Sequence, residues 1–176
     1  YAAGYKATKH LIDQGCKRIA HITAGSEFGN LYNERKRGYI DALKKHNLPI
    51  EKELMVDLKT VTYNEALKAS TKLLDLKNRP DGVFASGDIM AVSAIQSAKR
   101  KGIRVPEDIA VIGFNNDPIS EIIDPNLSTI THPAAKMGQM SAEIILKSIK
   151  FPNKDEVKEI TFLNTEVLVR ESSKRN

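Results

Sequence analysis

The sequence predicts an α/β fold with a doubly wound parallel sheet. Short apolar runs rich in β-branched residues recur along the chain between turn-forming residues, as in strands buried on both faces. Segments with helical periodicity separate these runs, and this alternation is typical of a parallel sheet wrapped by helices. Polar residues follow several of the predicted strands, at the edge where ligands bind in such sheets.

The elements of the first half follow from the spacing of apolar residues and from residues that begin or end helices. Ala7 and Leu11 share one face of the first predicted helix, and Gly15 is suited to end it. Thr62 and Glu65 have capping-box spacing, which predicts the start of a further helix. The expected elements are a helix at 2–14, a strand at 19–23, a loop at 24–30, a helix at 32–46, a strand at 54–58 and then the capped helix.

The second half is centred on a short buried strand and the polar residues that follow it. Gly113 permits another backbone to come close, and Asn115 lies where this strand ends. Asp88 and Asp117 are placed to cap the helices that follow them. The expected elements are a strand at 82–86, a helix closed by Gly102, a strand at 109–114, a short helix at 119–123, a strand or extended crossover at 127–131, a helix from Pro133, a charged loop at 153–159, β-like residues at 160–170 and a frayed tail at 172–176.

Composition excludes several classes of protein. The 27 Lys and Arg residues exceed the 22 Asp and Glu residues, but they are dispersed, as on a solvated surface. The single cysteine, Cys16, excludes an internal disulfide and indicates a reducing compartment. No apolar run is long enough to span a membrane. The chain begins at Tyr1 with a helical pattern and no strand before it, so we expect it to be part of a longer protein.

The sequence contains no pattern that indicates catalysis. His10, His21, His46 and His132 are isolated from one another, and none has metal-ligand spacing to a cysteine or a second histidine. Phosphate-binding loops and the nucleophile-elbow motif are missing. We therefore expect no metal, no cofactor and no enzymatic activity.

Polar residues after the predicted strands form a candidate binding site for a small polyol or base. Arg35 offers a planar fork of donors that suits adjacent hydroxyls, and the amides of Asn33 and Asn115 can both donate and accept. Each residue has an alternative interpretation. Arg35 could be a solvated helix charge, Asp88 a helix cap, and Asn115 part of an Asx turn.

Several short motifs occur along the chain in a recognisable order. They are Ala3-Gly4-Tyr5, Arg18-Ile19-Ala20, Glu34-Arg35 with Gly38-Tyr39, Phe84-Ala85-Ser86-Gly87-Asp88, the run from Gly102 to Ile109, Gly113-Phe114-Asn115-Asn116 and the closing Leu168-Val169-Arg170-Glu171-Ser172. As an ordered set that covers nearly the whole chain, they resemble the LacI/GalR family of bacterial transcription repressors.

This resemblance implies a two-lobed effector domain of the periplasmic-binding-protein-like type I fold, of which the chain contains mostly the C-terminal lobe. Residues 1–130 would form that lobe, 131–163 would belong to the N-terminal lobe, and 164–176 would return to the C-terminal lobe. The family's helix-turn-helix DNA-binding domain is absent from this sequence.

The resemblance also implies which residues contact the effector. Gly87 stands where the family usually has an Asn that touches the effector. No aromatic residue occurs at 59–61, where one often lines the site, and this favours a small sugar over a stacked purine. The expected site residues are Arg35, Asn115, Asp88, Asn33 and Val61.

The family usually dimerises through this lobe, so we expect a homodimer. The candidate interface residues are Val92, Ile95, Ile122 and Ile123, with core packing as the alternative for each.

The resulting hypothesis is an effector-sensing domain of a cytoplasmic repressor, which binds a sugar in an interlobe cleft and touches no membrane. Operator DNA would be contacted only through the missing N-terminal domain. The alternative is an extracytoplasmic sugar-binding protein of a transport system, which shares the fold.

Overall fold

The computed structural model describes residues 1–25, 29–150 and 161–175. Residues 26–28 of the expected loop and the expected charged loop at 153–159 lie outside these ranges. The chain divides into two compact units, one made of Tyr1–Thr131 with Glu166–Asn176 and the other of His132–Thr165. These bounds lie close to the domain boundaries expected from the sequence. That the units belong to two different lobes stays a prediction.

The first unit is built on a parallel sheet with the strand order β2-β1-β3-β4, which confirms the predicted fold class. Its strands are β1 (Ile19–Ala24), β2 (Met55–Leu58), β3 (Gly82–Ala85) and β4 (Ala110–Ile112). The helices between them are α1 (Ala2–Asp13), α2 (Asn30–Lys45), α3 (Tyr63–Leu74) and α4 (Asp88–Arg100). The smaller elements are the 3-10 turn η2 (Lys52–Leu54), α5 (Ile119–Ile122), and the antiparallel pair β5 (Thr129–Ile130) and β6 (Val167–Leu168).

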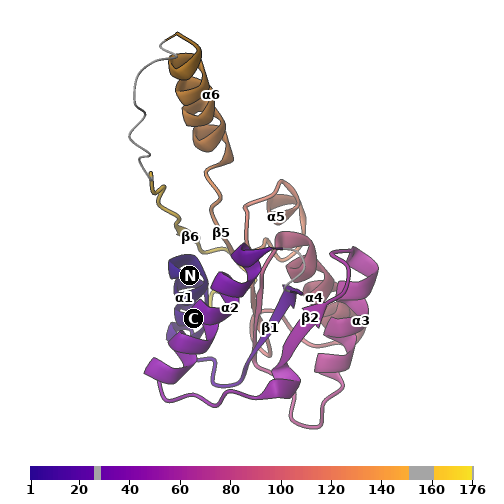
Figure 1. Ribbon diagram of the computed structural model, residues 1–176. Coiled ribbons are helices and arrows are strands. Elements are labelled where there is room, and N and C mark those ends of the chain that lie inside the picture. The colour runs from indigo at the N-terminus through magenta and orange to yellow at the C-terminus, as the bar shows by residue number, and fades with distance from the viewer. Residues whose placement is uncertain (26–28, 151–160, 176) are drawn as a thin grey trace. The chain divides into compact units, whose positions relative to one another are not determined.

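Helices cover both faces of this sheet, α1 and α2 on one and α3 and α4 on the other (Figure 1). Alternate strand residues therefore enter two separate cores. Phe84 packs with Leu11 and Leu43 on the α1–α2 side, while its neighbour Val83 packs with Ile95 on the α3–α4 side. This burial on both faces explains why β3 and β4 appear in the sequence as continuous apolar runs.

Local signals for helix ends are partly confirmed. Gly15 follows the end of α1 with a φ of +85°, as expected of a helix terminator. The Glu65 N–H donates to Thr62 Oγ1 over 3.3 Å, so Thr62 does cap α3. Asp117 is not the cap of α5, because Pro118 occupies that position and no side chain caps the helix.

The C-terminal tail was expected to fray, and the structure shows that this expectation is wrong. Ser172 and Ser173 are fully buried. The Val111 N–H donates to the Ser172 carbonyl, and Ser172 Oγ donates back to the Val111 carbonyl, each over 2.7 Å. Arg175 donates to the carbonyls of Pro106 and Asp81. The tail thus completes the free edge of β4.

The second unit contains helix α6 (Ala134–Lys150), which begins directly after Pro133. None of its residues is buried within the described part of the chain, and several of its apolar side chains are exposed, among them Ile144 and Ile149. In the described ranges, no helix combines the length and the apolar character that crossing a membrane requires. Residues 161–166 were expected to be β-like but form no strand. In this part of the chain only β6 is a strand.

Candidate functional site

Helix α2 is held against α1 by two glycines, and this contact positions Arg35. A Cβ on Gly4 would lie 2.3 Å from the Arg35 carbonyl oxygen, and a Cβ on Gly38 would lie 2.3 Å from the Tyr1 carbonyl oxygen. Real Cβ atoms do not come so close, so the two backbones can meet only because both residues lack side chains. The main chain of Arg35 is therefore fixed by helix packing.

The Arg35 side chain lies beyond the carboxyl ends of β3 and β4. Its Nη1 donates to the Ser86 carbonyl over 2.7 Å, and its Cζ lies 3.5 Å from the ring centroid of Phe114 and 5.4 Å from that of Tyr32. Burial lowers the pKa of Arg35 to about 10, so it remains a cation at neutral pH. No carboxylate in the described ranges forms an ion pair with it. Its other N–H groups are available to hydroxyls or to an anion.

Asn115 and Asn116 follow β4 in unusual backbone conformations, with φ values of 115° and 59°. The half-buried Asn115 amide has only a long contact of 3.5 Å, in which its Nδ2 donates to Asp117 Oδ2. This is not an Asx turn, in which the Asn side-chain oxygen would accept from the backbone N–H two residues on. The Asn116 amide is committed, because its Oδ1 accepts hydrogen bonds from Ser120 and Arg170. Asn115 is thus the residue of the pair that can reach a ligand.

Asp88 does not cap its helix, contrary to one expectation, because Gly87 is the N-cap and no side chain caps α4. Its carboxylate is fully buried and accepts from Thr129 Oγ over 2.6 Å and from the Asp117 N–H over 2.7 Å. Asp88 therefore ties α4 to β5 and to the segment after β4. An effector could reach it only by replacing these hydrogen bonds, so effector contact at Asp88 stays a prediction.

Gly113 makes room for this carboxylate. A Cβ at Gly113 would lie 2.2 Å from Asp88 Oδ1. The atom nearest to that Cβ position thus belongs to a side chain. The backbone approach expected from the sequence also occurs, because the Gly113 N–H donates to the Ser128 carbonyl over 2.8 Å.

Two of the predicted site residues are not brought to Arg35. Asn33 is exposed, and two residues along a helix correspond to about 200° of rotation, so it leaves α2 on the opposite side from Arg35. Val61 packs against the core on the α3–α4 side of the sheet. Both assignments as effector contacts remain untested predictions.

Sequence reasoning missed three residues that organise this edge of the sheet: Phe114, Ser86 and Arg170. Phe114 lies directly before the predicted Asn115, and an aromatic at that place could have been noticed as a platform for Arg35. Arg170 gives no local signal. It donates to the Leu127 carbonyl over 2.8 Å and to Asn116 Oδ1 over 2.9 Å, and both of these residues are far from Arg170 in the sequence.

Three of the four predicted dimer residues are core residues. Ile95 is fully buried, and Val92 and Ile123 belong to the same core cluster. Their side chains pack in this core, in line with the alternative interpretation, and their assignment to a dimer interface stays an untested prediction. Ile122 is 75% exposed and remains available for contact with a partner.

Two buried groups in this unit have displaced pKa values. His21 lies between the rings of Tyr39 and Phe84, with centroids 4.9 Å and 4.6 Å from its own, and burial lowers its pKa to about 4. Burial raises the pKa of Asp88 to about 6, although the hydrogen bond from Thr129 acts in the opposite direction. In both cases burial disfavours the charged form of the side chain, so His21 resists protonation and Asp88 resists losing its proton.

We expect an Asp88→Asn variant to lose stability more steeply than the unsubstituted chain between pH 7 and pH 4. As the pH falls through this range, His21 binds a proton in the unfolded chain but not in the folded chain. This difference lowers the free energy of unfolding by about 3 kcal/mol. Folded Asp88 binds a proton more tightly than unfolded Asp88, which adds about 2 kcal/mol over this range. In the unsubstituted chain the effects of His21 and Asp88 oppose each other, whereas the Asp88→Asn variant keeps only the destabilising effect of His21. Urea unfolding at each pH measures the slopes.

The matched variant is His21→Gln, which keeps only the effect of Asp88. Its stability should rise as the pH falls from 7 to 4, opposite in sign to Asp88→Asn. Parallel profiles for the two variants would contradict this assignment.

No group of three His, Cys, Asp or Glu side chains that could hold a metal ion occurs in residues 1–25, 29–150 and 161–175. The polar groups at the carboxyl edge of the sheet are instead hydrogen-bonding groups beside an aromatic ring. Such an arrangement binds a neutral polyol or a small anion.

Relatives of this chain are transcription regulators. It is 37% identical over 170 residues to the probable HTH-type transcriptional repressor ExuR of Bacillus subtilis, covering 97% of this chain and 50% of that protein. The structure of a LacI family transcriptional regulator from Enterococcus faecium with bound ribose has a TM-score of 0.83 at 29% identity, covering 97% of this chain and 62% of that one. A CelR–cellobiose complex, also a transcriptional regulator, has a TM-score of 0.87 at 31% identity, with coverage of 97% and 51%.

The chain spans about half the length of the curated relatives it matches. Residues 8–173 match the family model described as a periplasmic binding protein-like domain. The fold, the position of the polar edge and these relatives agree with the resemblance to LacI-type repressors. The chain belongs to the family of periplasmic binding protein-like domains.

Proposed function

We propose that this chain is the effector-sensing domain of a LacI-type transcriptional repressor and that it binds a small sugar at the carboxyl edge of its parallel sheet. The observation that carries the proposal is the Arg35 guanidinium, which is stacked on Phe114 and has no ion-pair partner in the described part of the chain. Two structural relatives whose descriptions name cellobiose and ribose support a sugar as the ligand class.

In this proposal Arg35 donates to two adjacent hydroxyls of the sugar, because its planar fork matches their spacing. Phe114 holds the guanidinium in place from one face, and the Asn115 amide supplies a donor and an acceptor from the end of β4. Sugar binding stabilises one conformation of the domain over another and so changes the population that binds DNA.

The remaining parts of the proposal concern the whole protein. Operator DNA is bound by a domain outside this chain, the protein is a cytoplasmic homodimer, and exposed Ile122 contributes to the dimer contact. No enzymatic step is part of its function. The relatives favour this repressor over the alternative of a transport protein, because they are transcription regulators.

A thermal-shift screen of the chain against mono- and disaccharides, starting with ribose and cellobiose, tests the proposal. A sugar at one hundred times its dissociation constant should stabilise the fold by about 2.7 kcal/mol, because it binds only the folded chain. A chain that no sugar stabilises would contradict the proposed ligand class.

We expect Arg35→Ala to weaken binding of the sugar found in that screen by about ten- to a hundredfold, because it removes charge-assisted hydrogen bonds worth about 1.5–3 kcal/mol. The matched control is Arg37→Ala. Arg37 is on the same helix, but it is exposed and pairs with Glu34 over 2.9 Å. Calorimetric titration that shows equal affinities for the two variants would remove Arg35 from the site.

A further inference from the structure

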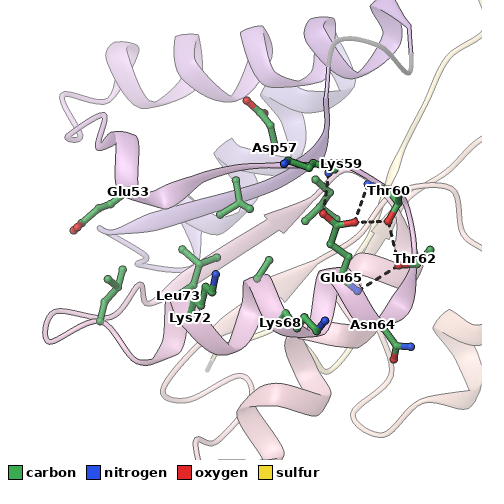
Figure 2. A pocket seen from close by; sticks show the side chains of 14 residues that line it. Glu53, Asp57, Lys59, Thr60, Thr62, Asn64, Glu65, Lys68, Lys72 and Leu73 are labelled. Atoms are coloured by element: carbon green, nitrogen blue, oxygen red, sulfur yellow. Dashed lines mark hydrogen bonds between the residues drawn. The ribbon is translucent and has the colours of Figure 1, made fainter.

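A groove of about 650 Å³ lies between strand β2 and helix α3, apart from the residues around Arg35 (Figure 2). We call it the β2–α3 groove. Its apolar floor comes from both elements and from the residue that lies just beyond α3, and consists of Val56, Leu58, Ala69, Leu73 and Leu76. Its walls are polar and carry Thr and Lys side chains, which Figure 2 shows along α3 and at the end of β2. Neither the proposed sugar site nor the expected dimer contact uses this groove.

The groove is long enough for an extended chain. Its lining includes residues from Glu53 before β2 to Thr60 after it, so it follows the whole strand. The lining continues from Thr62, the N-cap of α3, to Leu76 just beyond the helix, and on α3 itself Glu65, Lys68 and Lys72 recur every three or four positions along one face. A compact ligand would fill only part of such a channel, whereas an extended peptide matches its shape.

Strand β2 also presents a free backbone edge. It is an edge strand of the sheet, and the Gly25 N–H donates to the Leu58 carbonyl on the side that faces β1. Because the peptide groups of successive strand residues face opposite sides, the main chain of Asp57 faces outward. Within the described residues, neither its N–H nor its carbonyl has a backbone partner on that side. Such an edge is a template for a further strand.

The charges available in the groove are positive. Its acidic side chains are already engaged: Asp57 pairs with Lys36 over 2.7 Å, Glu53 pairs with Arg18, and the Glu65 carboxylate accepts two backbone N–H groups. In contrast, three lysines of the lining have no ion-pair partner in the described part of the chain. They are Lys59, Lys68 and Lys72.

We propose that the β2–α3 groove binds an extended acidic segment of a partner protein, which adds a strand to the free edge of β2. Main-chain hydrogen bonds to Asp57 hold the segment, its apolar side chains enter the floor of the groove, and its carboxylates pair with Lys59, Lys68 and Lys72. A second copy of this chain does not match the charges, because its own β2–α3 face carries the same three lysines and would repel them.

The first experiment measures binding of a fluorescein-labelled ten-residue peptide of alternating Glu and Val by fluorescence anisotropy. A peptide of the same length with Lys in place of Glu is the charge control. We expect saturable binding of the acidic peptide alone, weakened by sodium chloride because its ion pairs are partly exposed.

Two pairs of variants separate charge from backbone pairing. Lys68→Glu with Lys72→Glu should weaken peptide binding at least tenfold, whereas Lys77→Glu, an exposed lysine outside the groove, should not. Asp57→Pro removes the outward N–H, and Asp57→Ala removes only the carboxylate. We expect Asp57→Pro to bind several-fold more weakly than Asp57→Ala, since an edge strand tolerates proline but cannot donate from it.

Three results would overturn the proposal. They are no binding of the acidic peptide, equal binding by the charge-reversed and unsubstituted chains, and equal binding by the two Asp57 variants. The last result, together with full displacement of the peptide by inorganic phosphate, would identify a site for small anions instead. Thermal unfolding of each variant verifies that it is folded before its affinity is compared.

Discussion

Replacing Gly113 with Ala is expected to destabilise the chain by about 3–5 kcal/mol, which is the sum of overpacking and of buried polar groups left without partners. The new Cβ would lie 2.2 Å from Asp88 Oδ1 and 3.1 Å from a methyl carbon of Leu127. Asp88 would have to move, and its hydrogen bonds with Thr129 and Asp117 would break. The urea midpoint should therefore fall sharply, and soluble yield should fall with it.

Two further variants identify the cause of this loss. In an Asp88→Ala background the new Cβ meets no carboxylate, so Gly113→Ala should be much less harmful there, and a double-mutant cycle measures the difference. Gly138→Ala is the control for glycine replacement itself, because a Cβ there has no neighbour within 4 Å. An equal loss in both Asp88 backgrounds would show that the clash is not with the carboxylate.

Removing the tail after Glu171 is expected to destabilise the chain by about 3 kcal/mol or more, because it leaves buried backbone groups without partners at about 1–3 kcal/mol each. The Val111 N–H and carbonyl would both lose Ser172, and the Ser128 N–H would lose its bond of 2.8 Å to Ser172 Oγ. Arg175 would also no longer bridge Pro106 and Asp81. Urea unfolding of the truncated chain measures the loss.

Single substitutions in the tail show which contacts matter. Ser172→Ala removes two of these hydrogen bonds and should reproduce part of the loss. Lys174→Ala should change little, because this side chain is exposed. A truncated chain with the midpoint of the intact chain would contradict a structural role for the tail.

Much of the fold could be predicted because its signals are local or periodic. A strand buried on both faces is mostly apolar, and β3 and β4 therefore appear in the sequence as short apolar runs, while the buried β1 also contains His21 and Thr23. Helix ends depend on the residues beside them, so Thr62 and Gly15 were identified correctly. The cap predicted at Asp117 was wrong, and this residue instead donates its backbone N–H to the Asp88 carboxylate, which is distant in the sequence.

The candidate site was only partly predictable, because spacing along the chain does not show which way a side chain points. Arg35 could be selected as the cation that follows β1, but its platform, Phe114, comes from a strand two positions away in the sheet. Asn33 was chosen because it is near Arg35 in the sequence, but the rotation of the helix places it on the opposite side of α2 from Arg35. Ile95 appeared suitable for an interface because an apolar helix face is the same whether it meets a core or a partner.

The sequence by itself determined the fold class, the order of the elements and the rim on which polar residues gather, because apolar periodicity and the direction of parallel strands are sufficient for these. The tertiary structure decided the rest. It buried the polar tail against β4, turned Asp88 into a structural link and opened the groove beside β2. Each of these features rests on hydrogen bonds or packing between residues far apart in the chain, which no local pattern records.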